Sequence, residues 1–320
     1  MARFVARRLA FMVVVLFLIS VGVFALFYAH PGNPARTIAG RQASAQQVQL
    51  IAHRLGLDQP LLSRYGHFAD RLFLHADLGT DFQNGEPVRS ELATRLPATA
   101  SLTAGAALLW LAMGIPIGVQ AATRPRSARD RFATAFALIG LSMPTFVLGL
   151  LALYVLFFSL TKAGVSLFPG SGYVPLTQDP LQWLRHLVLP WFTLALVSAA
   201  TYSRLTRGSL IETMSEDYIR TARSKGLREW RVVYRHGMRS AMTPVLTQLG
   251  IDVGALLGGA IVVESVFSIN GIGKFAVDSI LSDDQPVIIG AVLLGTFFVV
   301  AANTLVDLLY AVLDPRVRLA

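Results

Sequence analysis

Six long apolar stretches constrain the fold of this chain more than any other feature of its sequence. A helix rises 1.5 Å per residue, so about 20 apolar residues cross the roughly 30 Å of hydrocarbon in a bilayer. Backbone polar groups in lipid must be paired, and these stretches lack the period-two alternation of barrel strands. The sequence therefore predicts an all-α, polytopic membrane protein with six transmembrane helices. The stretches are Leu9–Ala29, Thr99–Ala122, Phe132–Phe158, Leu187–Tyr202, Ala241–Val263 and Val287–Val312.

The fourth and the first stretches differ from a simple membrane span. The fourth is short and contains Pro190, and we expect its helix to continue past Arg204 into the aqueous phase. The first follows a basic run, as the apolar part of a signal peptide would. However, it is longer than the usual apolar run of about 7–15 residues, and Phe27-Tyr28-Ala29 places a bulky residue where cleavage requires a small one. We therefore expect a retained membrane anchor.

The charge of the chain fits a membrane protein rather than a nucleic-acid-binding protein. Only 15% of the residues are charged, against about 25% in soluble domains, and the net charge is +9. Arginines in short loops beside apolar spans face anionic lipid headgroups, so the excess needs no nucleic acid as partner. The sequence contains no cysteine, which excludes disulfides and thiolate metal sites.

The distribution of lysine and arginine predicts the orientation. The 67-residue segment between the first two spans is too long to follow the positive-inside rule. Without it, the segments on the side of the two termini carry 18 lysines and arginines, and the opposite segments carry 3. We therefore expect both termini in the cytoplasm.

The long segment His30–Leu96 is predicted to be structured. Its apolar residues recur at near-helical spacing, which indicates two short helices on the outer surface, separated by a break at Gly56–Pro60. The chain then divides into an anchor with an external helical part (1–94), a five-span core (95–313) and a cytoplasmic tail (314–320).

The longest cytoplasmic segment predicts a further short helix, Glu216–Lys225. Ser215 offers a hydroxyl as N-cap, and Glu216 and Asp217 place acids in the positive first turn. Gly226 stands at the position after the C-cap, where left-handed backbone is common. A helix of this length is too short and too polar to cross lipid.

One face of this short helix suits a partner. Tyr218 and Ala222 are four residues apart and should share a face, so that an aromatic side chain lies beside a small one. Such a face fits a groove on a soluble protein. The alternatives are a helix lying on the membrane surface and a solvated loop.

The same segment carries a family resemblance. The sequence from Asp217 to Leu227 resembles the cytoplasmic coupling loop, or EAA loop, of ABC importer permeases, above all in the dipeptide, oligopeptide and nickel branch. Arg220-Thr221 stands where the general pattern has Glu-Ala, whereas Ala222 and Gly226 keep their spacing. The general Leu-Pro ending is absent and Arg239 occupies the proline position, as is typical of the peptide branch.

Seven further motifs resemble the same branch, in order and over nearly the whole chain. Asn33 and Asn270 depart from the usual aspartate and proline. The long external segment resembles that of the first of the two permease subunits in such systems. The motifs are Arg7-Arg8-Leu9, His30–Ala35, Leu55–Pro60, Asp77–Phe82, Arg95–Thr99, Glu264–Gly273 and Asp314-Pro315-Arg316.

The resemblance implies a type I ABC importer permease in the bacterial inner membrane, forming half of a pathway for short peptides. Its implied partners are a second, similar permease, two ABC ATPase subunits and an external substrate-binding protein, with ATP and magnesium on the ATPases and no cofactor here. The printed sequence contains no G-x-x-x-x-G-K-[ST] phosphate loop. Nickel, glutathione and haem are alternative cargoes in the same family. The residues implied to enter the ATPase groove are Asp217, Tyr218, Thr221, Ala222 and Gly226.

The fifth span contains two further candidate features. Gly250, Gly254 and Gly258 are four residues apart on one face, where small residues let backbones approach closely. That face packs either against the second permease or against another helix of this chain. Asp252 lies near the middle of the span, and a carboxylate there is costly. It either faces the pathway and attracts a peptide ammonium group, or makes a structural hydrogen bond.

No catalytic or metal site is predicted. The six histidines form neither an H-E-x-x-H pattern nor a pair four residues apart, and no serine sits in a G-x-S-x-G turn. Two other classes remain as alternatives: an ion-driven secondary transporter, which inverted repeats would support, and a membrane-embedded enzyme.

Overall fold

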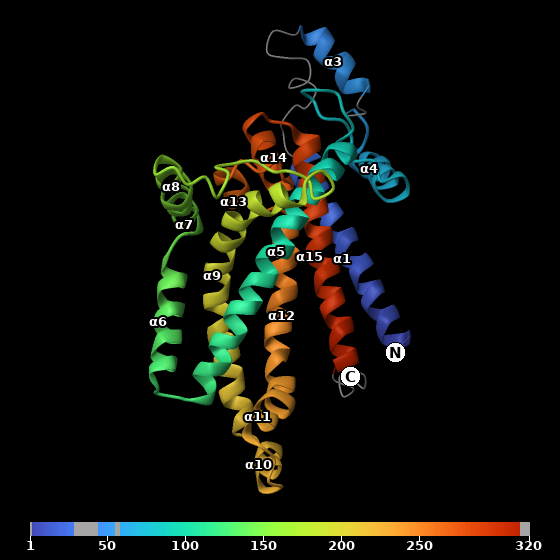
Figure 1. The fold of residues 1–320 in the computed structure, drawn as a ribbon. Coiled ribbons are helices and arrows are strands. Elements are labelled where there is room, and N and C mark those ends of the chain that lie inside the picture. The colour runs from blue at the N-terminus through green and yellow to red at the C-terminus, as the bar shows by residue number, and fades with distance from the viewer. Residues whose placement is uncertain (1, 29–43, 55–57, 314–320) are drawn as a thin grey trace.

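The computed structural model describes residues 2–28, 44–54 and 58–313, so the motifs His30–Ala35 and Asp314-Pro315-Arg316 and the tail 314–320 lie outside the described part. The described residues form a bundle of long helices with smaller helices at both ends (Figure 1), and they contain no β-strand. The helices of the first half are α1 (Ala2–Tyr28), α3 (Ala45–Arg54), α4 (Leu61–His75), α5 (Val88–Thr123), α6 (Ala128–Ser142), α7 (Thr145–Ala152) and α8 (Leu160–Lys162). Those of the second half are α9 (Pro180–Met214), α10 (Asp217–Ser224), α11 (Glu229–Arg231), α12 (Met238–Leu257), α13 (Ile261–Val266), α14 (Ile272–Leu281) and α15 (Gln285–Leu313).

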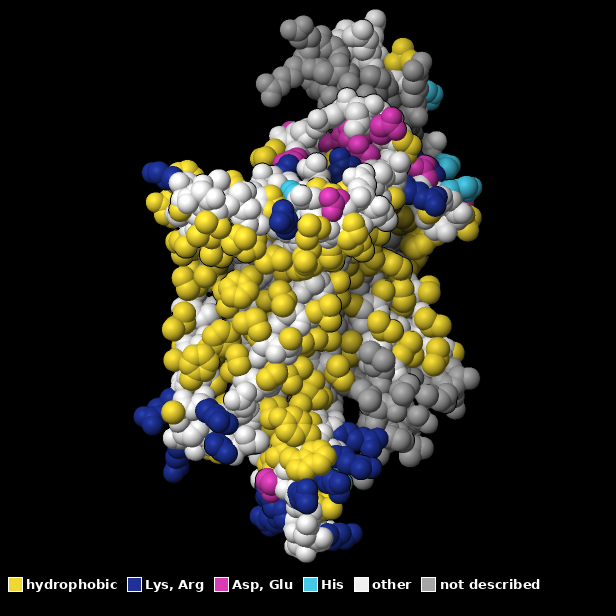
Figure 2. All heavy atoms as spheres, in the orientation of Figure 1, with side chains coloured by type: hydrophobic (Ala, Val, Ile, Leu, Met, Phe, Trp, Pro, Cys, Tyr) yellow, Lys and Arg dark blue, Asp and Glu magenta, His cyan; other side chains and the backbone are white. Residues whose placement is uncertain are grey.

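In the described part of the chain, six helical segments are long and apolar enough to cross a membrane, which agrees with the predicted number. Figure 2 shows a broad apolar belt around the middle of the molecule on the face drawn. The predicted extension of the fourth span is also confirmed, because α9 continues past Arg204 to Met214. The segments are Val5–Phe27, Val88–Thr123, Thr145–Lys162, Pro180–Met214, Glu229–Leu257 and Gln285–Leu308.

Two predicted span boundaries are wrong. The third stretch was expected to be one helix over Phe132–Phe158, but it breaks at Met143 and Pro144 between α6 and α7. Proline disfavours helical backbone in the residue before it, and Met143 is extended. After α7 the helix continues through a π-helical segment, Leu153–Ser159.

The fifth stretch ends earlier than expected, at Leu257 instead of Val263. Gly259 has a φ of +132°, which a residue with a side chain rarely adopts, so the helix stops and the short α13 starts in a new direction. At its other end α12 follows α11 through a second π-helical segment, Val232–Gly237.

The boundary expected at residues 94 and 95 does not coincide with a break in the structure. Helix α5 starts at Val88 and continues through Arg95, so the first helix of the core starts within the segment that was expected to precede it. The two short helices predicted before it are present as α3 and α4, and their location on the outer surface stays a prediction.

The core is formed mainly between α5 and α9, which approach each other closely. A Cβ atom on Gly105 would lie within the ring of Trp191, so only glycine leaves room for this indole. The indole Nε1 donates to the carbonyl of Ser101 at 3.0 Å, across the helix pair. Close contact through small residues, supported by an interhelical hydrogen bond, is how helices associate in lipid.

A buried carboxylate holds α5, α13 and α14 together at the end of the bundle that carries α3 and α4. Glu264 is fully buried, and it accepts from the hydroxyl of Thr99 (2.8 Å) and from the backbone N–H of Lys274 in the first turn of α14 (2.8 Å). The Thr99 hydroxyl in turn accepts from the backbone N–H of Ile272 at 2.9 Å. Burial raises the pKa of Glu264, and these donors oppose that effect. The motif around Glu264 therefore supplies the N-terminal cap of α14.

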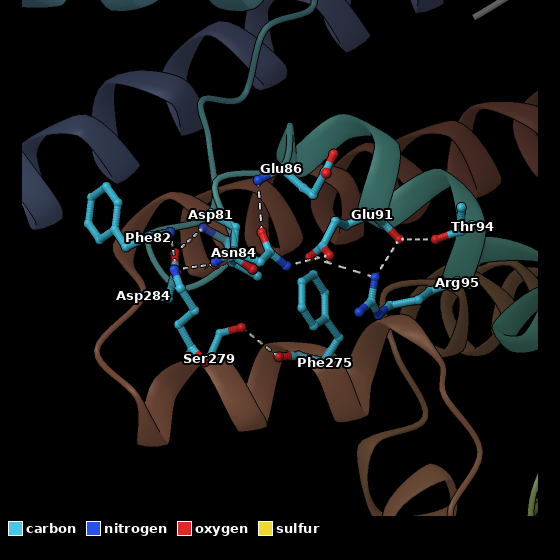
Figure 3. Close-up of polar contacts among 12 residues, drawn as sticks. Asp81, Phe82, Asn84, Glu86, Glu91, Thr94, Arg95, Phe275, Ser279 and Asp284 are labelled. Carbon is cyan, nitrogen blue, oxygen red and sulfur yellow. Dashed lines mark hydrogen bonds and ion pairs between the residues drawn. The ribbon is translucent and has the colours of Figure 1, made fainter. Parts of the chain in front are cut away.

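A second polar cluster joins the loop before α5 to α14 and α15 (Figure 3). The backbone N–H of Phe82 donates to Asp284 at 2.7 Å, and Asp284 also accepts weakly from Val287 in the first turn of α15. Burial raises the pKa of Asp284. The guanidinium of Arg95 lies 3.7 Å from the centre of the Phe275 ring, which joins α5 to α14.

We predict that Thr99→Val destabilises the chain. Valine has nearly the same shape, but it removes both hydrogen bonds and leaves the Ile272 N–H unpaired, at a cost of about 1–3 kcal/mol. The midpoint of thermal unfolding in detergent should fall, and Thr99→Ser should restore most of it. A valine variant that melts with the wild type would contradict this account of the Glu264 cluster.

Candidate functional site

The short helix α10 lies beyond the ends of α9 and α12, at one extreme of the molecule (Figure 1). Helix α9 ends at Met214, the chain turns at Ser215 and Glu216, and α10 then runs over Asp217–Ser224. It is shorter by one residue at each end than predicted. The sequence therefore places a separate helix outside the apolar belt.

The start of α10 differs from the prediction. Glu216 is the N-cap and makes no side-chain capping bond, whereas the Ser215 hydroxyl donates back to the carbonyl of Glu212 at 2.6 Å. The predicted serine cap is therefore wrong, because α9 reaches so far that Ser215 still belongs to its last turn. Asp217 does lie in the first turn, where the helix dipole favours an acid.

The end of α10 agrees with the prediction for Gly226. This residue has a φ of +74°, and its N–H donates to Arg223 while the N–H of Leu227 donates to Ala222. These two bonds form a Schellman motif, which pairs the last carbonyls of the helix. Glycine adopts the left-handed backbone here without the steric cost that a Cβ atom would impose.

A small apolar cluster fixes α10 against the rest of the chain. Ile219 is fully buried and Ala222 nearly so, and both pack with Val232, Met214 and Leu227. Met214 ends α9 and Val232 starts the segment that leads to α12. The cluster therefore places α10 between the ends of these two long helices.

An ion pair closes the turn after α10. Arg223 contacts Glu229 of α11 with both ends of its guanidinium, at 2.7 and 3.3 Å. Both side chains are partly exposed, so the pair orients the turn more than it stabilises the fold.

The five residues predicted for a partner groove divide into two sets. Asp217, Tyr218, Thr221 and Gly226 are exposed, whereas Ala222 is buried within the chain. The prediction that Tyr218 and Ala222 share an exposed face is therefore wrong for Ala222. On a short helix, two residues one turn apart can fall on different sides of the line between its buried and exposed faces. Here Ala222 lies three residues after the fully buried Ile219 and belongs to the same buried cluster.

Asp252 lies in the transmembrane part of α12, where two neutral donors hold its carboxylate. The Tyr202 hydroxyl of α9 donates to Oδ2 and the Gln248 amide donates to Oδ1, both at 2.9 Å. The ring of Tyr202 is fully buried and lies 5.8 Å from that of Trp110 on α5. The carboxylate thus connects α9 to α12 within one chain. Sequence reasoning did not identify Tyr202 or Gln248, because nothing in the sequence pairs these two helices.

The three glycines of α12 face α15 of the same chain. A Cβ atom on Gly250 would meet Val306, one on Gly254 would meet Val299, and one on Gly258 would meet Gly295. These contacts agree with the alternative in which the glycine face packs against another helix of the same chain. Small residues allow the two helices to approach closely in lipid.

Two family models match the chain. One describes a binding-protein-dependent transport system inner membrane component and matches residues 114–319, and the other describes the N-terminal part of such a membrane component and matches residues 1–103. The fold is also that of a solved structure, an inward-facing conformation of the MetNI methionine ABC transporter. That likeness has a TM-score of 0.55 and 17% identity, and covers 71% of this chain and 97% of the other.

Curated relatives match over the full length. A peptide transport system permease protein of Brucella abortus is 42% identical, and the glutathione transport system permease protein GsiC of Escherichia coli K12 is 39% identical. Each alignment covers 99% of this chain and 99% of the relative. The resemblance carried by the coupling-loop sequence therefore extends to the whole chain, and the ion-driven transporter and the membrane enzyme are set aside. The chain belongs to the family of inner-membrane components of binding-protein-dependent transport systems, and it is a multi-pass permease subunit of an ABC importer.

Proposed function

We propose that this permease forms half of a translocation pathway for short peptides and receives its driving force from separate ATPase subunits through α10. ATP and magnesium reside on those subunits, a second permease of the same family completes the pathway, and an external binding protein delivers the substrate. The observation that carries the proposal is the placement of α10, whose buried side is fixed to α9 and α12 while Asp217, Tyr218 and Thr221 face outward.

The exposed side of α10 is suited to a protein partner. Tyr218 is 45% exposed, and tyrosine anchored on a short, well-supported helix is a frequent centre of binding energy at interfaces. Asp217 and Arg220 pair with each other at 3.3 Å beside it. Ala222 then contributes by letting α10 pack closely on Val232, rather than by entering the partner's groove.

We infer that α10 and both chain termini lie in the cytoplasm. On the face drawn, basic side chains gather at the end of the molecule that carries α10, and acidic ones gather at the opposite end (Figure 2). Arg8 of α1 and Asp307 of α15 form an ion pair at 2.7 Å, so the first and last spans run antiparallel to each other. The positive-inside rule then supports cytoplasmic termini.

Peptide cargo is supported by two observations. The relatives from Brucella and Escherichia coli are named for peptide and glutathione transport, and glutathione is itself a short peptide with an ammonium group. Among the described residues, the Asp252 carboxylate is held by the neutral side chains of Tyr202 and Gln248, at a depth where a peptide ammonium group would need a counter-charge. Glutathione is therefore the second candidate cargo. Nickel and haem stay alternatives of the same family.

We predict that Gly226→Pro uncouples ATP hydrolysis from transport. Proline fixes φ near −65°, so the turn at +74° cannot form and α10 loses its attachment to the segment before α12. Reconstituted complexes should still hydrolyse ATP, while uptake per ATP falls at least roughly tenfold, which corresponds to about 1.4 kcal/mol of coupling.

The matched control for this variant is Gly226→Asn, since asparagine tolerates left-handed backbone better than other residues with a side chain. Its uptake should stay near that of the wild type. Wild-type uptake by the proline variant would overturn the role of α10, whatever the ATPase rate.

We predict that Asp252→Asn weakens peptide uptake while the complex still assembles. Asparagine keeps an acceptor for Tyr202 but removes the charge, so the half-saturating peptide concentration should rise roughly tenfold. Tyr202→Phe is the control, because it removes the link between α9 and α12 and leaves the charge. Equal defects in the two variants, or loss of assembly in Asp252→Asn, would assign Asp252 a structural role instead.

A further inference from the structure

Helix α4 packs against the membrane-spanning part of α1. The ring of Tyr65 lies edge-on to Phe17 and Phe24 of α1, and its hydroxyl lies 3.0 Å from the hydroxyl of Ser20. Phe68, one turn further along α4, is buried against Phe24. The contact therefore involves the same α1 residues that must cross the bilayer.

The position of this contact along α1 fixes the depth of α4. The apolar span of α1 ends at Phe27, and Ser20 lies about 10 Å before that end at 1.5 Å per residue. Ser20 is fully buried. A helix whose side chains reach this level cannot lie wholly in water above the membrane, so α4 lies at the boundary between headgroups and acyl chains.

Apolar and polar side chains lie on different sides of α4, as expected for a helix at this boundary. The face toward α1 contains Tyr65, Phe68 and Leu72. Beside that face, Leu62 and Phe73 are 84% and 49% exposed, and they share a side because three helical turns separate them. The opposite side contains Ser63, His67, Asp70 and Arg71. The apolar side of α4 is therefore wider than the face that contacts α1.

We propose that Leu62 and Phe73 of α4 insert into the outer leaflet of the bilayer, and that α4 is an interfacial helix that supports α1. The membrane-spanning helix α1, against which α4 packs, also has exposed apolar residues, such as Phe17 and Val21. Its polar side meets headgroups and water, where arginine and histidine are favoured. This inference requires that α1 spans the membrane, and its assignment to the outer leaflet rests on the proposed cytoplasmic location of the termini. It does not depend on the transported substrate or on a coupling role of α10.

The natural chain has no cysteine, which makes a direct test possible. Single cysteines at Leu62, Phe73, Asp70 and Leu74 would be labelled with the environment-sensitive fluorophore NBD in the full-length permease, assembled in phosphatidylcholine nanodiscs. Leu74 is the matched control for Leu62, since it is also a leucine, is 75% exposed, and lies on the polar side of the same helix. Quenching would be compared between lipids brominated near the headgroup end of the acyl chain and aqueous iodide.

We expect brominated lipid to quench NBD at positions 62 and 73 at least about twofold more than at 70 and 74, with the order reversed for iodide. Equal iodide quenching at all four positions would overturn the proposal, because α4 would then be surrounded by water. Protection of positions 62 and 73 from both quenchers would also overturn it, because a protein partner would then cover this side. Uptake measured on the labelled variants reports separately on the proposed function.

Discussion

The close contact between α5 and α9 is the interaction on which the other features depend. In lipid, apolar side chains gain little by leaving the solvent, so helices associate where their backbones can approach and exchange hydrogen bonds. Gly105 leaves room for Trp191, whose indole then donates to a backbone carbonyl of α5. This contact positions α9, and α9 in turn carries Tyr202 in mid-membrane and leads to α10.

The carboxylates of the chain are held by different means according to their depth. Asp130, near the cytoplasmic end of α6 on the proposed orientation, forms a bidentate pair with Arg207, and that hydrogen bond lowers the pKa of Asp130. Glu264 at the opposite end is held by a hydroxyl and a helix N-terminus, and Asp252 between them by a hydroxyl and an amide. A carboxylate with neutral donors can change partners at lower cost than one locked to arginine, because no second buried charge is left behind.

Sequence reasoning identified the features that depend on local chemistry. Hydropathy and length locate the six spans, and glycine after a short polar helix correctly places the left-handed residue at Gly226. The features it missed depend on neighbours distant in sequence. Ala222 is buried because Val232 and Met214 lie against it, and Asp252 meets Tyr202 because α5 positions α9. The break at Met143 was missed for a different reason: Pro190, Pro97 and Pro116 are accommodated within helices, whereas Pro144 follows the end of one.

The proposed roles of α10 and Asp252 are connected through α9 and α12, because each of them contacts both helices or their ends. Met214 and Val232 bring the end of α9 and the start of the α12 segment to the same apolar cluster under α10, and Tyr202 and Asp252 join the same two helices within the membrane. Force applied to α10 therefore acts on α9 and α12 as a pair, and a change in their relative position must either carry the Tyr202–Asp252 hydrogen bond along or break it. If it breaks, the carboxylate becomes available to a cation in the same step that moves the helices. In the proposed importer, this arrangement would link the exposure of a counter-charge for peptide to the motion of the partner ATPase.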